Sequence, residues 1–540
     1  MATSQDDPSP ARHLPTVRPD TPYRDREPAD NACHSLNTQA QGSTVHLLNM
    51  ISEAKAAGWL QLPPEAFLPW TKLNDIAFSH VLPGVSMGKG GALLASNELN
   101  SNDGTPQALM TVPRPLILSL ERVIEHAKVD KDFREVLESL GEFGRTSRGA
   151  ILTFLLVQVS VSCPHLSERV GVHSPFTEYV KSLPCELLPT FWSPGELQLL
   201  VGSTLAPAIS SKLRSLRRKY DKFCEATRTT HWFQIVRDAL SFDDWLQVDA
   251  MYRSRALDFP GIGHCMVPCI DLANHAAGDA TTAIYEKDGD GNAVLLLRDG
   301  KSLAKGEEVT ITYGDEKGAC EMLFSYGFLE SERQTAETLF LSLSIPDDDP
   351  YRGAKMGFAD CAPGFKLIDT GEVEVDWKGD FIWLLCVSAE DGLHFDLART
   401  VDGEEEVHAF FGEHELVGGA QELGAVICKT EMWDVYHLRA VTILQQRVFE
   451  QMQVLCGTQE DIEATAHGEL TDVRDRCYEQ AMQLRRLEMR LLNSAYEDFE
   501  LQTERFADSE VVLHYLARVN DNDHDTNAEQ GEAEVEEDFS

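Results

Sequence analysis

The sequence predicts an α+β fold in which a β-rich region is split by a long helical insert and followed by a mostly helical region. Three observations lead to this prediction. Short β-type runs with glycine-rich turns occur over residues 44–94 and resume after Phe259, helical periodicity fills most of the interval between them, and long amphipathic helices are predicted near the C-terminus. Because strands and helices do not alternate, the order of elements disfavours a doubly wound nucleotide-binding fold.

A polar connection over residues 97–103 separates the first β element from the helical insert. In five segments of the insert the apolar residues recur at helical spacing. These predicted helices cover residues 116–127, 132–140, 148–161, 176–183 and 209–223. The most apolar stretch of the chain, residues 150–163, contains several polar side chains and is shorter than the roughly 18 apolar residues that a membrane span needs.

Strand patterns return after the insert and lead into a short helix. A turn over residues 288–292 joins the first two of these strands, and the helix is predicted over residues 317–324. The predicted strands cover residues 283–285, 293–298 and 308–313.

The last region begins at about residue 334 with a β-type run over residues 338–345. It ends in amphipathic helices that are predicted over residues 431–456 and 472–494. One stripe of the second helix consists of Leu484, Leu487 and Leu491. We interpret this stripe as intramolecular core rather than as a groove for a partner.

The charge of the chain restricts its partners. Its 540 residues include 88 acidic and 47 basic side chains, which gives a net charge of −41. Such a charge disfavours sequence-independent binding to nucleic acid or to anionic lipid, so we expect neither a nucleic-acid nor a membrane partner. A basic partner would complement the charge.

Both ends of the chain are expected to be disordered, over residues 1–43 and 519–540. The N-terminal arm is rich in Pro, Asp and Arg and lacks the apolar segment of a signal peptide. Nine acidic residues and no Lys or Arg lie within residues 521–540, although most of the net charge belongs to the rest of the chain. The tail serves either solubility or the capture of a basic partner.

The twelve cysteines are scattered along the sequence, and none forms a C-x-x-C pair. This pattern is typical of reduced thiols in an intracellular protein. We therefore expect the chain in the cytoplasm, the nucleus or both.

Two short motifs match known signatures only in part. Residues 84–88 (GVSMG) fit the nucleophile elbow of hydrolases, but the glycines at 90 and 91 disfavour the helix that must follow it. Glycines at these positions also indicate a backbone that approaches a ligand or another strand closely. Residues 288–299 resemble a calcium-binding loop, but Ala293 replaces the required glycine, so a hairpin turn is favoured.

A dense group of potential metal ligands occurs within twelve residues. No second cysteine pair follows downstream, and two cysteines four residues apart share one face of a strand, so we predict no metal site. The group consists of His264, Cys265, Cys269, Asp271 and His275.

The strongest functional signals are the Asn274–His275 pair after an apolar run and the segment over residues 306–315 (GEEVTITYGD). Taken alone, each of these two signals has a purely structural explanation. The Asn274–His275 pair can close a turn, and the tyrosine before the glycine in residues 306–315 can end a strand. Together with residues 271–275 (DLANH) and 321–328 (EMLFSYGF), they form a recognisable set.

This set resembles the C-terminal half of a SET-domain protein-lysine methyltransferase of the subclass similar to the Rubisco large-subunit methyltransferase. The resemblance extends over about residues 44–515. It implies a SET domain over residues 44–333, with its helical insert at about 97–250, and a helical substrate-binding domain over residues 334–518. It also implies S-adenosyl-L-methionine as the cofactor.

The resemblance assigns roles to individual residues. Asn274 and His275 would contact the cofactor, and Tyr313 would be the active-site tyrosine. The remaining assignments are cofactor contacts for Gly88 and Gly90, for Arg253 or Arg255, and for Tyr326 and Phe328, with Tyr285 in the substrate channel. Arg253 and Arg255 stay alternatives, because Trp245 and residues 252–255 (YRSR) match the family's segment with a two-residue ambiguity. Ala276 stands where the family often has Ser.

These residue types suit methyl transfer to an amine. The reaction is an in-line displacement that needs alignment and electrostatics but no metal and no covalent intermediate. A substrate lysine has to arrive neutral, and an apolar aromatic channel lowers its pKa by desolvation. Tyr313 would orient the amine without acting as a general base.

The sequence therefore predicts a monomeric, S-adenosylmethionine-dependent methyltransferase that modifies a lysine of a protein substrate with a basic target segment. Two alternatives remain open. One is a histidine acceptor, which relatives of this architecture can methylate. The other is a catalytically silent SET-fold interaction protein.

Overall fold

The computed structural model describes residues 50–56, 58–101, 107–163, 166, 170–184, 187–371, 374–399, 405–466 and 473–519. The predicted N-terminal arm and, except for Val519, the predicted acidic tail lie outside the described residues. None of the helices in the described part of the chain combines the length and the hydropathy of a membrane-spanning helix.

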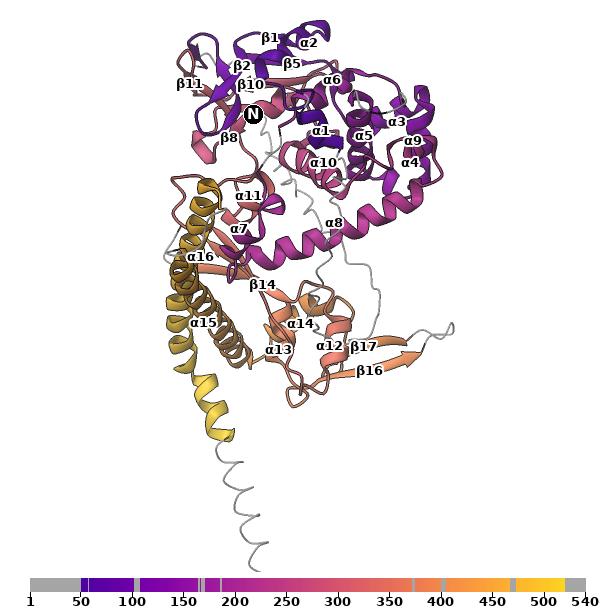
Figure 1. Cartoon of the computed structure of the whole chain (residues 1–540). Helices are drawn as coiled ribbons and strands as arrows, with labels where there is room; N and C mark the ends of the chain where they lie inside the picture. The colour runs from indigo at the N-terminus through magenta and orange to yellow at the C-terminus, as the bar shows by residue number, and fades with distance from the viewer. Residues whose placement is uncertain are drawn as a thin grey trace, which may run out of the picture. The chain divides into compact units, whose positions relative to one another are not determined.

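One four-stranded sheet joins segments that lie far apart in the sequence (Figure 1). Its order is β2 (Val81–Ser86), β3 (Gly90–Ala95), β12 (Glu308–Ile311) and β8 (Asn274–His275). The first two pairings are antiparallel. β12 and β8 pair in parallel, with Thr310 opposite Asn274 and Ile311 opposite His275. The Asn-His pair and the strand that leads to Tyr313 therefore lie next to each other at one edge of this sheet.

A second sheet also pairs strands from before and after the helical insert. β10 lies between β5 and β9 and is antiparallel to both. The predicted turn over residues 288–292 connects β9 and β10, and the Asp288 carboxylate accepts backbone N–H bonds from Asp290 and Asn292. The strands are β1 (Ala77–Phe78), β5 (Gln107–Val112), β9 (Ala283–Lys287) and β10 (Ala293–Leu297), with the short pairs β4 (Leu99–Asn100) and β11 (Ser302–Leu303), and β6 (Leu257–Phe259) and β7 (Gly263–Cys265).

The insert is helical, as the periodicity predicts. The segment predicted over residues 116–127 begins later than expected, because two prolines favour a 3-10 turn at Arg114–Leu116 and the Ser119 side chain caps the helix. The helices are α3 (Leu120–Val129), α4 (Lys131–Ser139), α5 (Ser147–Ser162), α6 (Pro175–Ser182), α7 (Pro194–Gln198), α8 (Leu205–Thr227), α9 (His231–Val236) and α10 (Phe242–Arg255), preceded by α1 (Met50–Ala56) and α2 (Leu68–Leu73).

Helix α5 explains the most apolar stretch of the sequence. Almost all of its side chains are buried among the other helices of the insert. Its polar side chains find partners inside the protein: Ser160 accepts a hydrogen bond of 2.8 Å from the Trp232 indole. The stretch is therefore a core helix, and its polar interruptions are internal hydrogen-bonding groups.

The C-terminal region contains more strand than the sequence predicts. Only β13 (Thr338–Ser342) was expected, and it pairs with β14 (Gly364–Asp369) and β15 (Val375–Lys378). A second three-stranded sheet consists of β16 (Leu393–Arg399), β17 (Glu405–Phe411) and β18 (His414–Leu416). β15 (VDWK) and β16 (LHFDLAR) alternate apolar and polar residues as strands do, whereas β14, β17 and β18 alternate less regularly. The helices are α12 (Arg352–Phe358), α13 (Phe381–Cys386), α14 (Gly419–Ile427), α15 (Trp433–Ala466) and α16 (Asp475–Ala507).

The two long helices α15 and α16 pack side by side (Figure 1). The predicted stripe of Leu484, Leu487 and Leu491 is buried, which confirms its interpretation as intramolecular core. α16 also reaches the helical insert, because the buried Glu488 carboxylate accepts hydrogen bonds from the Thr204 hydroxyl (2.5 Å) and backbone N–H (3.2 Å). Thr204 is the residue before α8, so this contact joins the two regions.

Candidate functional site

The parallel pairing of β8 and β12 brings the predicted site residues together. The buried His275 ring accepts a hydrogen bond at Nδ1 from the backbone N–H of Tyr313, with an N–N distance of 3.0 Å. The Tyr313 hydroxyl in turn donates to the carbonyl of Ala273 at 2.9 Å. Both the main chain and the side chain of Tyr313 are thus fixed by the segment that carries the Asn-His pair.

Helix α11 (Ala319–Tyr326) and the residues that follow it add two aromatic side chains to this site, Tyr326 and Phe328. The Tyr326 ring lies 4.5 Å from that of Tyr313, and Phe328 lies 6.5 Å from Tyr326 and 6.4 Å from His275, between ring centroids. The helix ends at Gly327 in the left-handed conformation (φ 77°), which reverses the chain so that Phe328 returns to the same cluster. The structure therefore assembles the predicted aromatic set around Tyr313.

Tyr285 belongs to the neighbouring sheet and lies near Tyr326. Its ring stacks on Phe259 at 5.4 Å. Burial raises the pKa of both Tyr285 and Tyr326, so both phenols are neutral over the physiological pH range. The site accordingly presents neutral aromatic surfaces.

A lysine of the chain itself borders the site. The Lys317 amino group donates a hydrogen bond of 2.5 Å to the carbonyl of Tyr313 and lies 5.9 Å from the centroid of the Tyr326 ring. Lys317 therefore binds the carbonyl of Tyr313, whereas His275 binds the N–H of the same residue.

The glycine-rich turn between β2 and β3 is tied to the same place. The Asn274 side-chain amide donates to the carbonyl of Gly91 (3.2 Å) and to the Glu308 carboxylate (2.6 Å). Gly88 and Gly90 have φ angles of 78° and 85°, and a Cβ on either would meet no atom within 4 Å. The turn thus combines a conformation that favours glycine with an open side where a ligand can approach the backbone.

The two candidate arginines hold different parts of the site. Arg253 donates to the Phe324 carbonyl at 2.9 Å and lies 3.5 Å from the Asp249 carboxylate. Arg255 donates to the Asp271 carbonyl at 2.7 Å. Arg253 is therefore anchored to α11, and Arg255 to the segment before Asn274. Because both have protein partners, both assignments stay open.

Sequence reasoning missed several charged residues that organise the site. Glu330 contacts His275, with 3.1 Å between Oε1 and Nε2, and Arg333 pairs with Glu330. Asp249 is buried with Arg148, Lys212 and Arg253 around it. The only sequence signal for Glu330 was a charge two residues after the buried aromatic cluster, and a single charge does not reveal its partner.

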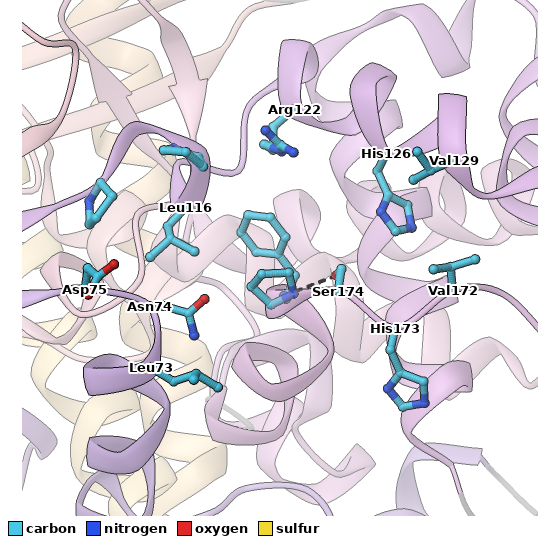
Figure 2. A pocket seen from close by; sticks show the side chains of 14 residues that line it. Leu73, Asn74, Asp75, Leu116, Arg122, His126, Val129, Val172, His173 and Ser174 are labelled. Carbon is cyan, nitrogen blue, oxygen red and sulfur yellow. Dashed lines mark hydrogen bonds between the residues drawn. The ribbon is translucent and has the colours of Figure 1, made fainter.

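A cavity of about 440 Å³ lies elsewhere, between α2, α3 and α6. Figure 2 shows Leu73, Asn74 and Asp75 on one side of it and His126, Val172 and His173 on the other. None of the predicted site residues lines this cavity. Among the described residues, no three His, Cys, Asp or Glu side chains are grouped as metal ligands would be.

Comparisons with known proteins relate the chain to SET-domain proteins. It is 27% identical over 278 residues to SET domain-containing protein 8 of Schizosaccharomyces pombe. This match covers 50% of this chain and 61% of the relative. It is 30% identical over 222 residues to the chloroplastic Rubisco large-subunit N-methyltransferase of Pisum sativum, or 39% of this chain and 45% of the relative. The chain thus matches about half the length of these relatives, and no family model matches it.

A further relative is the actin-histidine N-methyltransferase of Danio rerio, at 28% identity over 178 residues, 32% of this chain and 29% of the relative. A solved structure that the chain resembles is the SET domain of the Rubisco large-subunit methyltransferase bound to methyl-lysine and S-adenosylhomocysteine. The two chains superpose with a TM-score of 0.56 and are 21% identical in sequence. That match covers 83% of this chain and 93% of the solved chain, which confirms the predicted α+β fold. In sequence and in fold, the chain is therefore similar to SET-domain proteins of the Rubisco large-subunit methyltransferase type.

Proposed function

We propose that the chain is an S-adenosylmethionine-dependent protein methyltransferase that modifies a lysine side chain of a protein substrate. The observation that carries the proposal is the position of Tyr313, whose backbone N–H and hydroxyl are both held by the segment 273–275 beside a set of neutral aromatic rings. A phenol fixed in this way suits the orientation of an amine.

The residues around this phenol suit the cofactor. Asn274, His275, Gly88, Gly90 and one of the two candidate arginines would hold it, because the Asn274 amide binds the carbonyl of Gly91, which directly follows the open glycine turn. S-adenosylmethionine would supply the methyl group from its positively charged sulfonium.

The aromatic side chains would form the channel for the acceptor amine. Tyr285, Tyr326 and Phe328 exclude water and lower the pKa of a lysine amine by desolvation, so that it enters neutral. The Tyr313 hydroxyl would orient the amine and need not remove a proton.

The wider predictions belong to the same proposal. The region over residues 334–518 would hold the protein substrate, and the net charge of −41 favours a basic target segment. We expect the enzyme to act as a monomer in the cytoplasm or the nucleus.

Histidine is a second candidate acceptor, since one relative is an actin-histidine N-methyltransferase. A neutral imidazole is also a nucleophile that an aromatic channel can accept. The two acceptors differ in the modified residue that mass spectrometry identifies.

Transfer of labelled methyl from S-adenosylmethionine into a proteome, followed by identification of the modified residue, tests the proposal. Tyr313→Phe is expected to lower kcat about 10²-fold while cofactor binding, measured by calorimetry, changes less than threefold. The matched control is Tyr351→Phe, whose ring packs against Phe395 of β16. A native protein that binds no S-adenosylmethionine, or a Tyr313→Phe variant with native activity, contradicts the proposal.

A further inference from the structure

Glu330 makes a contact with the site that the reaction itself does not require. Its Oε1 lies 3.1 Å from His275 Nε2, and both of its oxygens accept hydrogen bonds of 2.8 Å from the Arg333 guanidinium. The side chains of His275 and Arg333 are 1% and 3% exposed, whereas that of Glu330 is 22% exposed. The three groups form a chain of contacts that leads from the protein surface to Tyr313.

The hydrogen bonds determine where the proton of His275 lies. Its Nδ1 accepts from the backbone N–H of Tyr313, and a ring nitrogen that accepts cannot also carry a proton. The neutral ring therefore carries its proton on Nε2, from which it donates to Glu330. A proton on Nδ1 would face the N–H of Tyr313 and push this residue out of place.

Arg333 offsets the effect that the Glu330 charge has on the protonation of His275. A bare carboxylate beside an imidazole favours the doubly protonated ring, which would remove the acceptor at Nδ1. The Arg333 charge offsets that of Glu330 while leaving its oxygens able to accept. Burial alone would raise the pKa of Glu330, but the hydrogen bonds from His275 and Arg333 outweigh it and lower the pKa to about 2.

Other charged groups near His275 come from three packed elements. From the loop between β12 and α11, Asp315 lies near His275, and Lys317 binds the carbonyl of Tyr313. From the segment after α11, Glu337 pairs with Arg333 at 2.7 Å. The phenols of Tyr313 and Tyr326 complete the set. Of these groups, Glu330 alone contacts His275 Nε2 among the described residues.

We propose that Glu330 and Arg333 are positioning residues that keep His275 in the Nε2–H form and thereby hold the backbone of Tyr313 for methyl transfer. This inference rests on the proposed function for its catalytic consequence, but the position of the proton is a property of the protein alone.

The first experiment is ¹⁵N NMR of the full chain labelled at histidine. Ring signals of His275 are assigned among the 17 histidines as those lost in His275→Gln. We expect a bare Nδ1 and a protonated Nε2 at pH 7.5. A proton on Nδ1 overturns the proposal whether or not the chain is a methyltransferase.

The second experiment measures kcat against pH for two variants. Arg333→Gln leaves the Glu330 charge uncompensated and so favours the doubly protonated ring of His275. We therefore expect the midpoint of the acid limb of the kcat–pH profile to rise by about one pH unit. Glu330→Gln keeps an acceptor without the charge, so the midpoint falls by about one pH unit. A purely structural role would lower activity in both variants without shifts in opposite directions.

The matched control is Glu332→Gln, an exposed carboxylate two residues along the chain, whose acid limb should coincide with that of the native protein. Coincident limbs in the two test variants, with S-adenosylmethionine binding and melting temperatures intact, overturn the proposal. Failure of the native chain to bind S-adenosylmethionine contradicts the proposed function instead, and leaves the NMR result to decide the position of the proton.

Discussion

At the scale of single residues, Asn274 has a distinct role from its neighbour His275. His275 holds Tyr313, whereas the Asn274 amide bridges the glycine turn and Glu308, whose carboxylate also pairs with Lys89 at 2.9 Å. Removal of the amide therefore uncouples the glycine turn from β8 without disturbing the contacts of Tyr313.

We expect Asn274→Ala to weaken S-adenosylmethionine binding about tenfold, which corresponds to the loss of about 1.4 kcal/mol from one bridging amide. Isothermal titration calorimetry measures the change in Kd. Asn100→Ala, at an exposed position of β4, is the matched control. An unchanged Kd in Asn274→Ala would remove Asn274 from the cofactor site.

Residue motifs predict the centre of the site better than its surroundings. The sequence places Asn274, His275 and Tyr313 in it because their neighbours form a recognisable set. Glu330 and Arg333 escape this reasoning, since their partners are set by how the chain folds back after α11. The choice between Arg253 and Arg255 also stays open, because a two-residue shift along one helix turn leaves both near the site.

At the scale of elements, the end of α11 decides whether the aromatic set can form. Gly327 has a φ of 77°, and a Cβ at this position would lie 2.8 Å from the Leu187 carbonyl. Both facts require glycine here. The sequence predicts the helix and its end at this glycine, because Tyr-Gly-Phe follows a short apolar run.

Gly327→Ala should lower the free energy of unfolding by about 1–3 kcal/mol, through backbone strain and the close contact, and should displace Phe328. Thermal and urea unfolding measure the loss, and methyl transfer measures the displacement. Gly289→Ala, in the turn between β9 and β10, is the control, because a Cβ there meets no atom within 4 Å. Equal stability of the two variants would contradict this account.

The long helices were predicted, whereas most strands of the C-terminal region were not. α5 is a long, almost continuous apolar run, and α16 has a regular apolar stripe at helical spacing. The strands β14 to β18 are held by pairing with one another, and pairing partners cannot be read from a short segment. This is why the C-terminal region contains two sheets where the sequence predicts one strand.

At the scale of the whole molecule, Glu488 joins α16 to the start of α8. Burial raises the pKa of its carboxyl to about 7, although Thr204 donates hydrogen bonds to it. The folded chain thus binds a proton here that the unfolded chain releases near its ordinary pKa of 4.5. This contribution to stability is complete below pH 4.5 and is lost as the pH rises through 7.

Glu488→Gln replaces the protonated carboxyl by a neutral amide of the same shape. We expect the variant to melt at a higher temperature than the native chain at pH 8, and the difference to shrink toward pH 5. Differential scanning calorimetry across this range tests the sign. Glu479→Gln, exposed on the same helix, should show no such trend, and a lower melting temperature for Glu488→Gln at pH 8 would contradict the assignment.

The net charge of −41 has a measurable consequence for substrate capture. If the target segment is basic, the KM for the protein substrate should rise several-fold between low salt and 0.5 M salt, because the Debye length shrinks to a few ångströms. The Kd for S-adenosylmethionine should change far less. A KM that does not depend on salt would contradict a basic target.

The parallel contact between β8 and β12 also bears on when the candidate site can form during folding. β3 meets β12 across more than two hundred residues of intervening chain, and β8 then adds to the edge of β12. Such distant pairings close late in folding, after the local helices of the insert have formed. We therefore expect the proposed cofactor site to be among the last parts to assemble, so that ligand binding during refolding reports completion of the whole domain rather than of any single element.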